Sequence, residues 1–365
     1  GASGVVLEGL CPTARGAVDR LLGGPQEGYA SSRTARRLAV TAWQRGSELA
    51  GDPAGVVGVA VTAALKTHEP KRGSHRVVVA THTCSSTSVA TLVLQKDARS
   101  RSDEEAVAAA LALERLSDAA GVPDAGRAGG GLALIGDEAV AVEACEAPPE
   151  WRGLLDGSLR LTRATAPARP ARHPVAPTTV VPGMLVFPGS FDPLHEGHLR
   201  MAVVAEEIAE RPLDFEISVT NVDKPLLDFV EMRSRAAQFA GRSLWFTRAA
   251  TFLEKLDLFP GGTFVMGADT YVRLADPRYY GGSPHEAARA VERIASEARG
   301  IIVFGRERGG SFEEPSRLDV PAPLRDVTYF VSQREFRMDI SSTALRHAAA
   351  AAADGSASGP GGATP

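Results

Sequence analysis

The chain has 365 residues, a length that suits two domains, each with a core of its own. Its formal net charge of −4 lacks the basic excess with which proteins neutralise nucleic-acid phosphates, so we expect small-molecule partners and no nucleic acid. No apolar run approaches the roughly 18 to 20 residues of a membrane span, which predicts no membrane insertion.

The cysteines and the first residues bear on the compartment. Cys11, Cys84 and Cys145 lie far apart without CxxC or Cys/His spacing, which argues against a disulfide framework and against a zinc site. This pattern favours a reducing compartment, either the cytoplasm or an organellar matrix. The sequence starts at Gly1 with neither an initiating Met nor a signal-peptide pattern, which leaves room for a removed targeting segment.

Residues 1–150 are predicted to form a first α/β domain. Small and apolar residues recur at helical spacing over 34–49, and Ser31 or Ser32 stands where an N-cap belongs. The β-branched runs 56–65 and 76–81 are typical of buried strands, and 104–116 has the pattern of an amphipathic helix.

A polar loop separates the two predicted strands. Its basic side chains and those beside it are His68, Lys71, Arg72, His75 and Arg76. Such a group can hold a phosphate, or it can be a solvated charged loop.

Two segments are predicted to lie outside the domains. Residues 151–183 are rich in Pro, Ala and Arg, and prolines this dense cannot sustain a helix or a central strand, so we expect much of this stretch to be a linker. Residues 353–365 consist of Gly, Ser, Ala and Pro with little apolar bulk, which predicts a disordered tail.

Between them, residues 184–352 are predicted to form the second domain. Strands are expected at 185–188, 215–220, 244–247, 263–266, 301–304 and 328–331, and helices at 197–210, 229–240, 250–258, within 285–298 and from Ser341. Strands separated by helices of this length predict a Rossmann-like parallel sheet with helices on both faces, so the fold class is α/β in both domains. In such sheets, ligands bind beyond the carboxyl ends of the strands.

The strongest motif follows the first strand of the second domain: Phe187-Pro-Gly-Ser-Phe-Asp-Pro-Leu-His-Glu-Gly-His198. Its turn, which includes Gly189, Ser190 and Phe191, allows the backbone to approach a ligand, and the following helix begins near two imidazoles. A helix N-terminus attracts phosphate, and His195 and His198 can donate hydrogen bonds as charge grows on phosphorus oxygens. Taken alone, the His-x-Gly-His tetrapeptide can equally be incidental or a metal-binding pair.

The string resembles the His-x-Gly-His signature of the nucleotidyltransferase superfamily, in particular nicotinate or nicotinamide mononucleotide adenylyltransferases. That resemblance implies ATP and Mg²⁺ as cofactors and assigns a role to Phe264-Val-Met-Gly-Ala-Asp269. In the family this stretch meets the nucleoside, which implicates Gly267 and Asp269. Alternatively, Asp269 caps the next helix.

Ile340-Ser-Ser-Thr-Ala-Leu-Arg346 extends the resemblance near the end of the chain. Here Ser341, Ser342, Thr343 and helix N–H groups are predicted to bind phosphate together with Arg346. The alternative is an ordinary Ser-capped helix with an exposed Arg.

The resemblance also places a phosphate-binding lysine after the second strand, where Asn221-Val-Asp-Lys-Pro225 supplies Lys224. A solvated surface Lys is the competing interpretation. Bacterial nicotinate members carry a Pro-Pro-His-Lys-like stretch here and a Trp where this chain has Pro277-Arg-Tyr-Tyr280. Tyr279 or Tyr280 can stack a pyridine ring or simply close the core.

Residues 1–150 resemble the C-terminal domain of CinA-type proteins, the fold of nicotinamide mononucleotide deamidases. The resemblance rests on the opening Gly1-Ala-Ser-Gly-Val-Val-Leu-Glu-Gly-Leu10, the helix after Gly28-Tyr-Ala-Ser-Ser32 and the strand 57–63. The family's Ser-Cys-Thr-Gly-Gly nucleophile segment does not occur in this sequence. We therefore expect a degenerate deamidase-like domain.

Together these features predict transfer of AMP from Mg-ATP to a pyridine mononucleotide with release of pyrophosphate, a step of NAD biosynthesis. His195, His198, Lys224 and Arg346 are the predicted catalytic residues. Two alternatives stay open: a cytidylyltransferase or phosphopantetheine adenylyltransferase-like enzyme, and a pseudoenzyme that acts as a scaffold. The chain can also be a homo-oligomer or a subunit of a larger complex. His198→Ala is expected to abolish transfer and leave the fold intact, because a residue at a solvent-facing helix start packs little.

Overall fold

A computed structural model describes residues 5–69, 73–122, 131–165, 179–308 and 311–337. The chain divides into two compact units. Of the described residues, unit 1 holds those within 5–156 and 223–233, and unit 2 holds those within 157–222 and 234–337. Each unit contains a sheet of its own.

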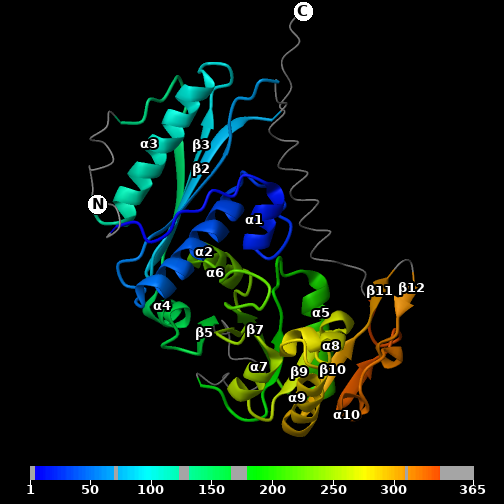
Figure 1. The fold of residues 1–365 in the computed structure, drawn as a ribbon. Coiled ribbons are helices and arrows are strands. Elements are labelled where there is room, and N and C mark those ends of the chain that lie inside the picture. Colours follow the sequence, from blue (N-terminus) through cyan, green and yellow to red (C-terminus); the bar gives the residue numbers. More distant parts are fainter. Residues whose placement is uncertain (1–4, 70–72, 123–130, 166–178, 309–310, 338–365) are drawn as a thin grey trace, which may run out of the picture. The chain divides into compact units, whose positions relative to one another are not determined.

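Unit 1 is built on a four-stranded antiparallel sheet in the order β1-β2-β3-β4 (Figure 1). Its elements are α1 (Arg15–Leu21), α2 (Ser32–Ala50), β1 (Gly58–Ala64), β2 (His75–His82), β3 (Ser86–Leu94), α3 (Arg101–Ala119), β4 (Val140–Glu146) and α4 (Pro149–Asp156). The predicted elements at 34–49, 56–65, 76–81 and 104–116 are thus confirmed, with shifted ends, while β3, β4 and α4 were not predicted.

Alternate residues of β2 face opposite helices in unit 1. Val77 and Val79 belong to a core cluster with Leu111 of α3, whereas Val78 and Ala80 pack with Ala39 of α2. Because successive strand residues point to opposite faces, α2 and α3 cover the two sides of the sheet. At the start of α2, the Ser31 hydroxyl accepts the N–H of Thr34 at 3.2 Å, so Ser31 is the N-cap.

Unit 2 contains a seven-stranded sheet. Its elements are β5 (Leu161–Thr165), β6 (Leu185–Pro188), α5 (Glu196–Ala209), β7 (Leu213–Ser218), α6 (Phe229–Ala237, with 229–233 in unit 1), β8 (Leu244–Thr247), α7 (Phe252–Leu258), β9 (Thr263–Gly267), α8 (Ala268–Arg273), η3 (Pro277–Tyr280), α9 (Pro284–Glu297), β10 (Gly300–Phe304), β11 (Arg306–Arg308), β12 (Ser311–Glu313), η4 (Pro315–Arg317), α10 (Ala322–Asp326) and β13 (Thr328–Val331). β11 and β12 form a separate two-stranded sheet.

The large sheet has the order β13-β10-β9-β6-β7-β8-β5. Every neighbouring pair is parallel except β5 and β8, which are antiparallel. Counted from β6, the parallel strands follow the doubly wound order 3-2-1-4-5-6, which reverses between β6 and β9. The Rossmann-like prediction is therefore confirmed, and a nucleotide site is expected where β6 and β9 end.

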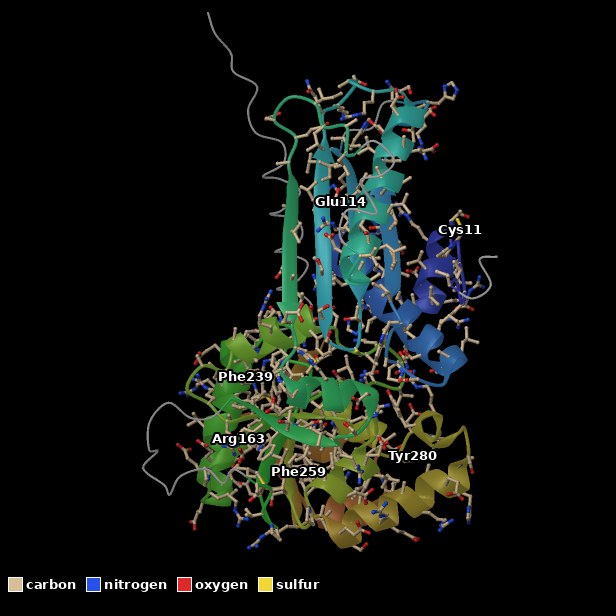
Figure 2. The ribbon with its side chains drawn as sticks, turned by 90° about the vertical axis from the view of Figure 1, so that its left-hand side faces the viewer. Cys11, Glu114, Arg163, Phe239, Phe259 and Tyr280 are labelled. Carbon is tan, nitrogen blue, oxygen red and sulfur yellow. The ribbon has the colours of Figure 1, made fainter. Side chains whose placement is uncertain are left out.

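Both faces of this sheet are covered. Leu185, Val186 and Phe187 follow one another in β6, and all three are buried although they point alternately to opposite faces. Phe239 and Phe259, which lie in the interior of unit 2 (Figure 2), are fully buried. Continuous burial of this kind is typical of a parallel sheet between two helical layers.

The predicted linker 151–183 contains regular structure. α4 extends to Asp156, and Leu161–Thr165 forms β5, which pairs with β8 at the edge of the sheet in unit 2. Arg163 of β5 stacks on the Trp245 ring at 4.8 Å. The prediction extended too far because the prolines are concentrated after residue 166, whereas 161–165 contains β-branched Thr and no Pro.

The predicted tail 353–365 and the predicted helix from Ser341 lie outside the described residues. None of the helices in the described part of the chain combines the length and the apolar character that a membrane span requires.

Candidate functional site

The loop between β6 and α5 has a backbone that only certain residues permit. Phe191 has a φ of 43°, in the left-handed region that side chains rarely adopt, and its ring is fully buried. A Cβ at Gly189 would lie 2.6 Å from the Phe191 ring, so glycine is required at that position. The Phe191 ring packs edge-on against Phe187 and Phe215. The loop is therefore anchored in the core by an aromatic side chain of its own.

Arg235, in the last turn of α6, and Gln238, which follows the helix, both contact the same loop. Buried Arg235 donates to the Ser190 carbonyl, and its guanidinium lies 3.0 Å from an Asp192 carboxylate oxygen. The Gln238 side-chain oxygen accepts the N–H of Leu194 at 2.8 Å. Neither residue was predicted from sequence. One signal was nevertheless present in the sequence: Arg235 is a charged residue on the buried face of α6, which is otherwise apolar.

The two histidines of the motif lie together at the start of α5. Their rings stack with centroids 3.7 Å apart, and His195 is the N-cap residue of the helix. The backbone N–H of His195 donates to Nδ1 of His198 at 3.3 Å, while the N–H of His198 donates to the His195 carbonyl at 2.9 Å. Because Nδ1 of His198 accepts a hydrogen bond, the proton of the neutral imidazole resides on Nε2.

Burial keeps both imidazoles neutral. Burial, and to a smaller extent the adjacent His195, lowers the pKa of His198 to about 3. Burial also lowers the pKa of His195. Nδ1 of His195 is buried, and no described residue provides it with a hydrogen-bond partner. An unpartnered buried polar atom at this position marks the place where a ligand or a water completes the site.

The burial of His198 corrects one expectation. Its ring lies edge-on to Phe191 at 5.0 Å and to Phe187 at 6.1 Å, so it contributes to packing and does not simply face solvent. His198→Ala must therefore also lower stability, because removing a partly buried ring leaves a cavity.

The strand next to β6 at the order reversal supplies the second predicted stretch. β9 ends at Gly267, which is the N-cap residue of α8, and Asp269 lies in the first turn of that helix and is partly buried. Asp269 is thus not the cap residue. A Cβ at Gly267 would meet no atom within 4 Å, which leaves space beside the end of β9. The structure brings this stretch and the histidine loop to the carboxyl ends of adjacent strands.

The structure does not show the other predicted phosphate ligands beside the histidine pair. Lys224 is exposed and belongs to the segment 223–233 of unit 1, whereas the histidine pair belongs to unit 2. Its phosphate role stays a prediction. Ser341, Ser342, Thr343 and Arg346 lie outside the described residues.

Tyr279 and Tyr280, which follow α8, make different contacts. The Tyr280 hydroxyl donates to the Leu274 carbonyl at 2.8 Å, and burial raises the pKa of the phenol. This hydrogen bond supports the core-closing alternative for Tyr280. The Arg278 guanidinium lies over the ring of Tyr279, 4.8 Å from the ring centroid.

In unit 1, one residue of the predicted basic loop lies in a strand instead. His75 is buried in β2, and its Nδ1 lies 2.6 Å from a carboxylate oxygen of the fully buried Glu104. His75 therefore cannot bind a phosphate from solution, because its imidazole is enclosed and already hydrogen-bonded. The strand begins one residue before the predicted run 76–81 and so includes His75. His68 is exposed, while Lys71 and Arg72 lie outside the described residues.

The sheet order and this loop together define a Rossmann-like domain. Residues 186–348 match the family model described as Cytidylyltransferase-like, which belongs to the nucleotidyltransferase superfamily. The match supports nucleotidyl transfer in general and implies a nucleoside triphosphate substrate, usually with Mg²⁺. The comparison with curated proteins found no match.

Proposed function

We propose that this chain transfers a nucleotidyl group from a nucleoside triphosphate to the phosphate of an acceptor, at the loop between β6 and α5. The observation that carries the proposal is the stacked pair of neutral imidazoles, His195 and His198, at the start of α5 where the strand order reverses. The Cytidylyltransferase-like match over 186–348 supports the same class of reaction.

In this reaction, an oxygen of the acceptor phosphate attacks the α-phosphorus of the nucleotide, and the bond from that phosphorus to the β-phosphate oxygen breaks to release pyrophosphate. The protein forms no covalent bond. Nε2–H of His198 is the free donor of that ring, and it stabilises charge that grows on the phosphoryl oxygens. The helix start adds backbone N–H groups, and the loop held by Arg235 keeps these donors in place before substrate arrives.

Magnesium fits this site as a companion of the triphosphate. Within the described ranges, no three His, Cys, Asp or Glu side chains gather as a metal cage. Mg²⁺ typically keeps water and substrate phosphates as ligands with only one or two protein carboxylates, so such a cage is not required. Bound to the triphosphate, the ion would neutralise phosphate charge.

For the specific substrates, we propose Mg-ATP and a pyridine mononucleotide, nicotinate or nicotinamide mononucleotide. The support is the resemblance of residues 187–198 and 264–269 to mononucleotide adenylyltransferases. A second candidate uses CTP in place of ATP, and the description of the matched family favours it. Both use the same histidine pair and differ in the base and the acceptor.

A substrate panel separates these candidates. Pyrophosphate release is measured with ATP or CTP, each with Mg²⁺, against nicotinate mononucleotide, nicotinamide mononucleotide, phosphopantetheine and phosphocholine. We expect ATP with a pyridine mononucleotide to give the highest turnover. A wide margin for CTP or for another acceptor would reject the pyridine assignment. If millimolar Mg-ATP and Mg-CTP also fail to raise the melting temperature, the chain is a scaffold, because binding to the native state alone must stabilise it.

For residues 1–150 we propose a deamidase-like domain without deamidase activity. The buried pair of His75 and Glu104 supports a structural role for part of the basic region. The test is release of ammonia from nicotinamide mononucleotide by the full chain. We expect none above background, and a steady rate would contradict the proposal.

A further inference from the structure

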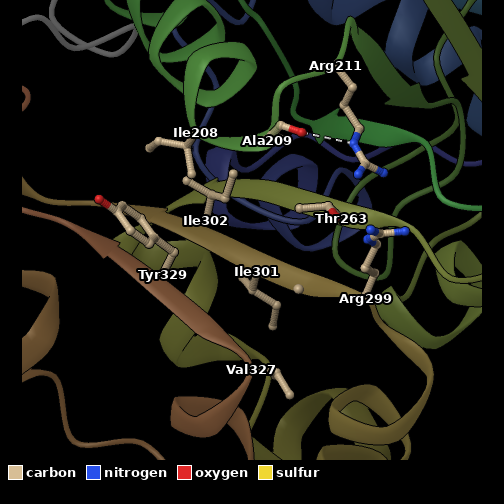
Figure 3. A pocket seen from close by; sticks show the side chains of 10 residues that line it. Ile208, Ala209, Arg211, Thr263, Arg299, Ile301, Ile302, Val327 and Tyr329 are labelled. Atoms are coloured by element: carbon tan, nitrogen blue, oxygen red, sulfur yellow. Dashed lines mark hydrogen bonds between the residues drawn. The ribbon is translucent and has the colours of Figure 1, made fainter.

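A polar pocket lies at the amino-terminal ends of β9 and β10 in unit 2 (Figure 3). It has a volume of about 270 Å³ and is lined by the first residues of β9 and β10, by the end of α5 and by β13. Thr263 begins β9, and Gly267, beside the nucleotide loop, ends it. With a rise of about 3.3 Å per residue, these two ends of β9 lie roughly 13 Å apart. The pocket is thus distinct from the site of the histidine pair.

Two arginines define the polar wall of this pocket. Arg211 is held in place by carbonyl groups: its Nε donates to the Ala209 carbonyl at 3.1 Å and its Nη1 to the Gly183 carbonyl at 2.6 Å. Figure 3 shows the first of these bonds and the Arg299 guanidinium nearby. A guanidinium has five N–H donors, so Arg211 keeps further donors for a ligand.

The backbone of Arg299 is hydrogen-bonded, whereas its side chain has no hydrogen-bond or ion-pair partner among the described residues. Its backbone N–H donates to the Gly262 carbonyl at 2.9 Å. No described residue forms a hydrogen bond or an ion pair with its guanidinium. The two guanidiniums are neighbours, because a Cβ built on Gly183 would lie 3.7 Å from Nη1 of Arg211 and 3.9 Å from Nη1 of Arg299.

No described carboxylate neutralises this pair of charges. Glu335 accepts the hydroxyl proton of the lining residue Tyr329 at 2.6 Å. Glu335 also accepts the N–H and the hydroxyl of Ser332, at 2.8 Å and 2.6 Å, so its oxygens are already occupied. Two neighbouring cations without a counter-charge repel each other, and an anion bound by both relieves that repulsion.

We propose that this pocket binds a phosphate group, either as inorganic phosphate or as a small phosphate monoester. A phosphate monoester carries nearly two negative charges at neutral pH, which match two guanidiniums better than the single charge of a carboxylate does. Ile208, Ile302 and Val327 also line the pocket, so part of its surface is apolar. The site goes beyond the proposed nucleotidyl transfer and does not depend on it.

The test is calorimetric titration of the full chain with inorganic phosphate at constant ionic strength, with acetate as the singly charged comparison. Arg299→Ala is expected to weaken phosphate binding about tenfold, the effect of losing a charge-assisted hydrogen bond. Arg289→Ala is the matched control, because Arg289 lies in α9 with an exposed side chain and an exposed ion pair. His198→Ala reports on phosphate that binds at the nucleotide loop.

We expect Arg289→Ala and His198→Ala to retain the affinity of the wild type, and Arg299→Ala to retain its nucleotidyl transfer. Three outcomes would overturn the proposal: no measurable phosphate binding, an affinity for phosphate that is unchanged in Arg299→Ala, or acetate that binds as tightly as phosphate. Because binding is measured separately from turnover, the site can fail while the proposed function stands, and the reverse also holds.

Discussion

Unit 1 contains a fully buried histidine and unit 2 a partly buried one, and the pKa of each falls to about 3, yet the two sites differ in kind. In unit 1, His82 is enclosed by the edge of Trp43 and the face of Phe229, and its Nδ1 lies 2.7 Å from the Thr87 hydroxyl. In unit 2, His198 lies at a helix start where strands β6 and β9 end. A lowered pKa therefore reports burial alone. The position relative to strand ends, and a second imidazole stacked on the first, distinguish a candidate site.

Substitution of His198 gives the largest expected difference between the two histidines. His198→Ala is expected to reduce nucleotidyl transfer by a factor on the order of 100 to 1,000, as for loss of one preorganised donor. His82→Phe, the matched change in unit 1, is expected to leave turnover within about twofold, because it preserves the aromatic packing without touching the site. Steady-state pyrophosphate release compares them. Equal losses in both variants would contradict the distinction.

The next effect concerns the support of the loop. Arg235→Ala leaves Asp192 without its buried partner, which is expected to cost about 3 kcal/mol in the free energy of unfolding. Arg233→Ala, two residues earlier in α6, removes an exposed ion pair with Glu143 and is expected to cost less than about 1 kcal/mol. Urea unfolding of both variants measures the difference. A small loss for Arg235→Ala would show that the loop does not depend on this residue.

Two glycines at the strand ends allow a similar comparison. Gly189→Ala forces a methyl group into the Phe191 ring and is expected to destabilise the protein by about 1 to 3 kcal/mol. Gly267→Ala enters open space, so little change in stability is expected. Thermal unfolding of the two variants is the measurement. If Gly267→Ala proved the more destabilising, the described loop packing would be wrong.

The smallest effect is the dependence of stability on pH. His82 has an ordinary pKa of 6.5 when unfolded and about 3 when folded, so the unfolded chain takes up the proton first as the pH falls. Stability is then present above about pH 6.5 and is lost on acidification, by about 1.4 kcal/mol per pH unit for this one proton. His82→Phe should remove that contribution. The measurement is urea unfolding of the wild type and of His82→Phe between pH 5 and pH 7.5. If the free energy of unfolding depended on pH equally in both proteins, the lowered pKa of His82 would be contradicted.

The sequence predicted the fold of unit 2 well, because its strands are short apolar runs separated by helical patterns. The position of the loop 187–198 also followed from sequence, since a glycine turn and two imidazoles stand directly after an apolar strand. Arg235 was missed because its partner Asp192 lies far away in the sequence, and only tertiary packing brings the two together. β5 was missed because a single five-residue edge strand lies beside a proline-rich segment.

Unit 1 was predicted less completely. β3 contains β-branched residues, but it follows a polar turn that obscures where the strand begins, and β4 is largely exposed. Burial of His75 against Glu104 could not be inferred, because a histidine beside basic residues usually indicates a solvated loop. The antiparallel pairing of β2 with β1 and β3 depends on contacts between strands that periodicity alone does not encode.

The most direct test of the central claim follows the α-phosphate itself. The chain is incubated with Mg²⁺, an acceptor mononucleotide and ATP or CTP labelled at the α-phosphorus, and the label is traced by chromatography. We predict that the label moves to the acceptor with one pyrophosphate released per transfer, and that His198→Ala slows the movement by a factor on the order of 100 to 1,000. Retention of the label on the triphosphate with every acceptor, or transfer that continues unchanged in His198→Ala, would contradict the account.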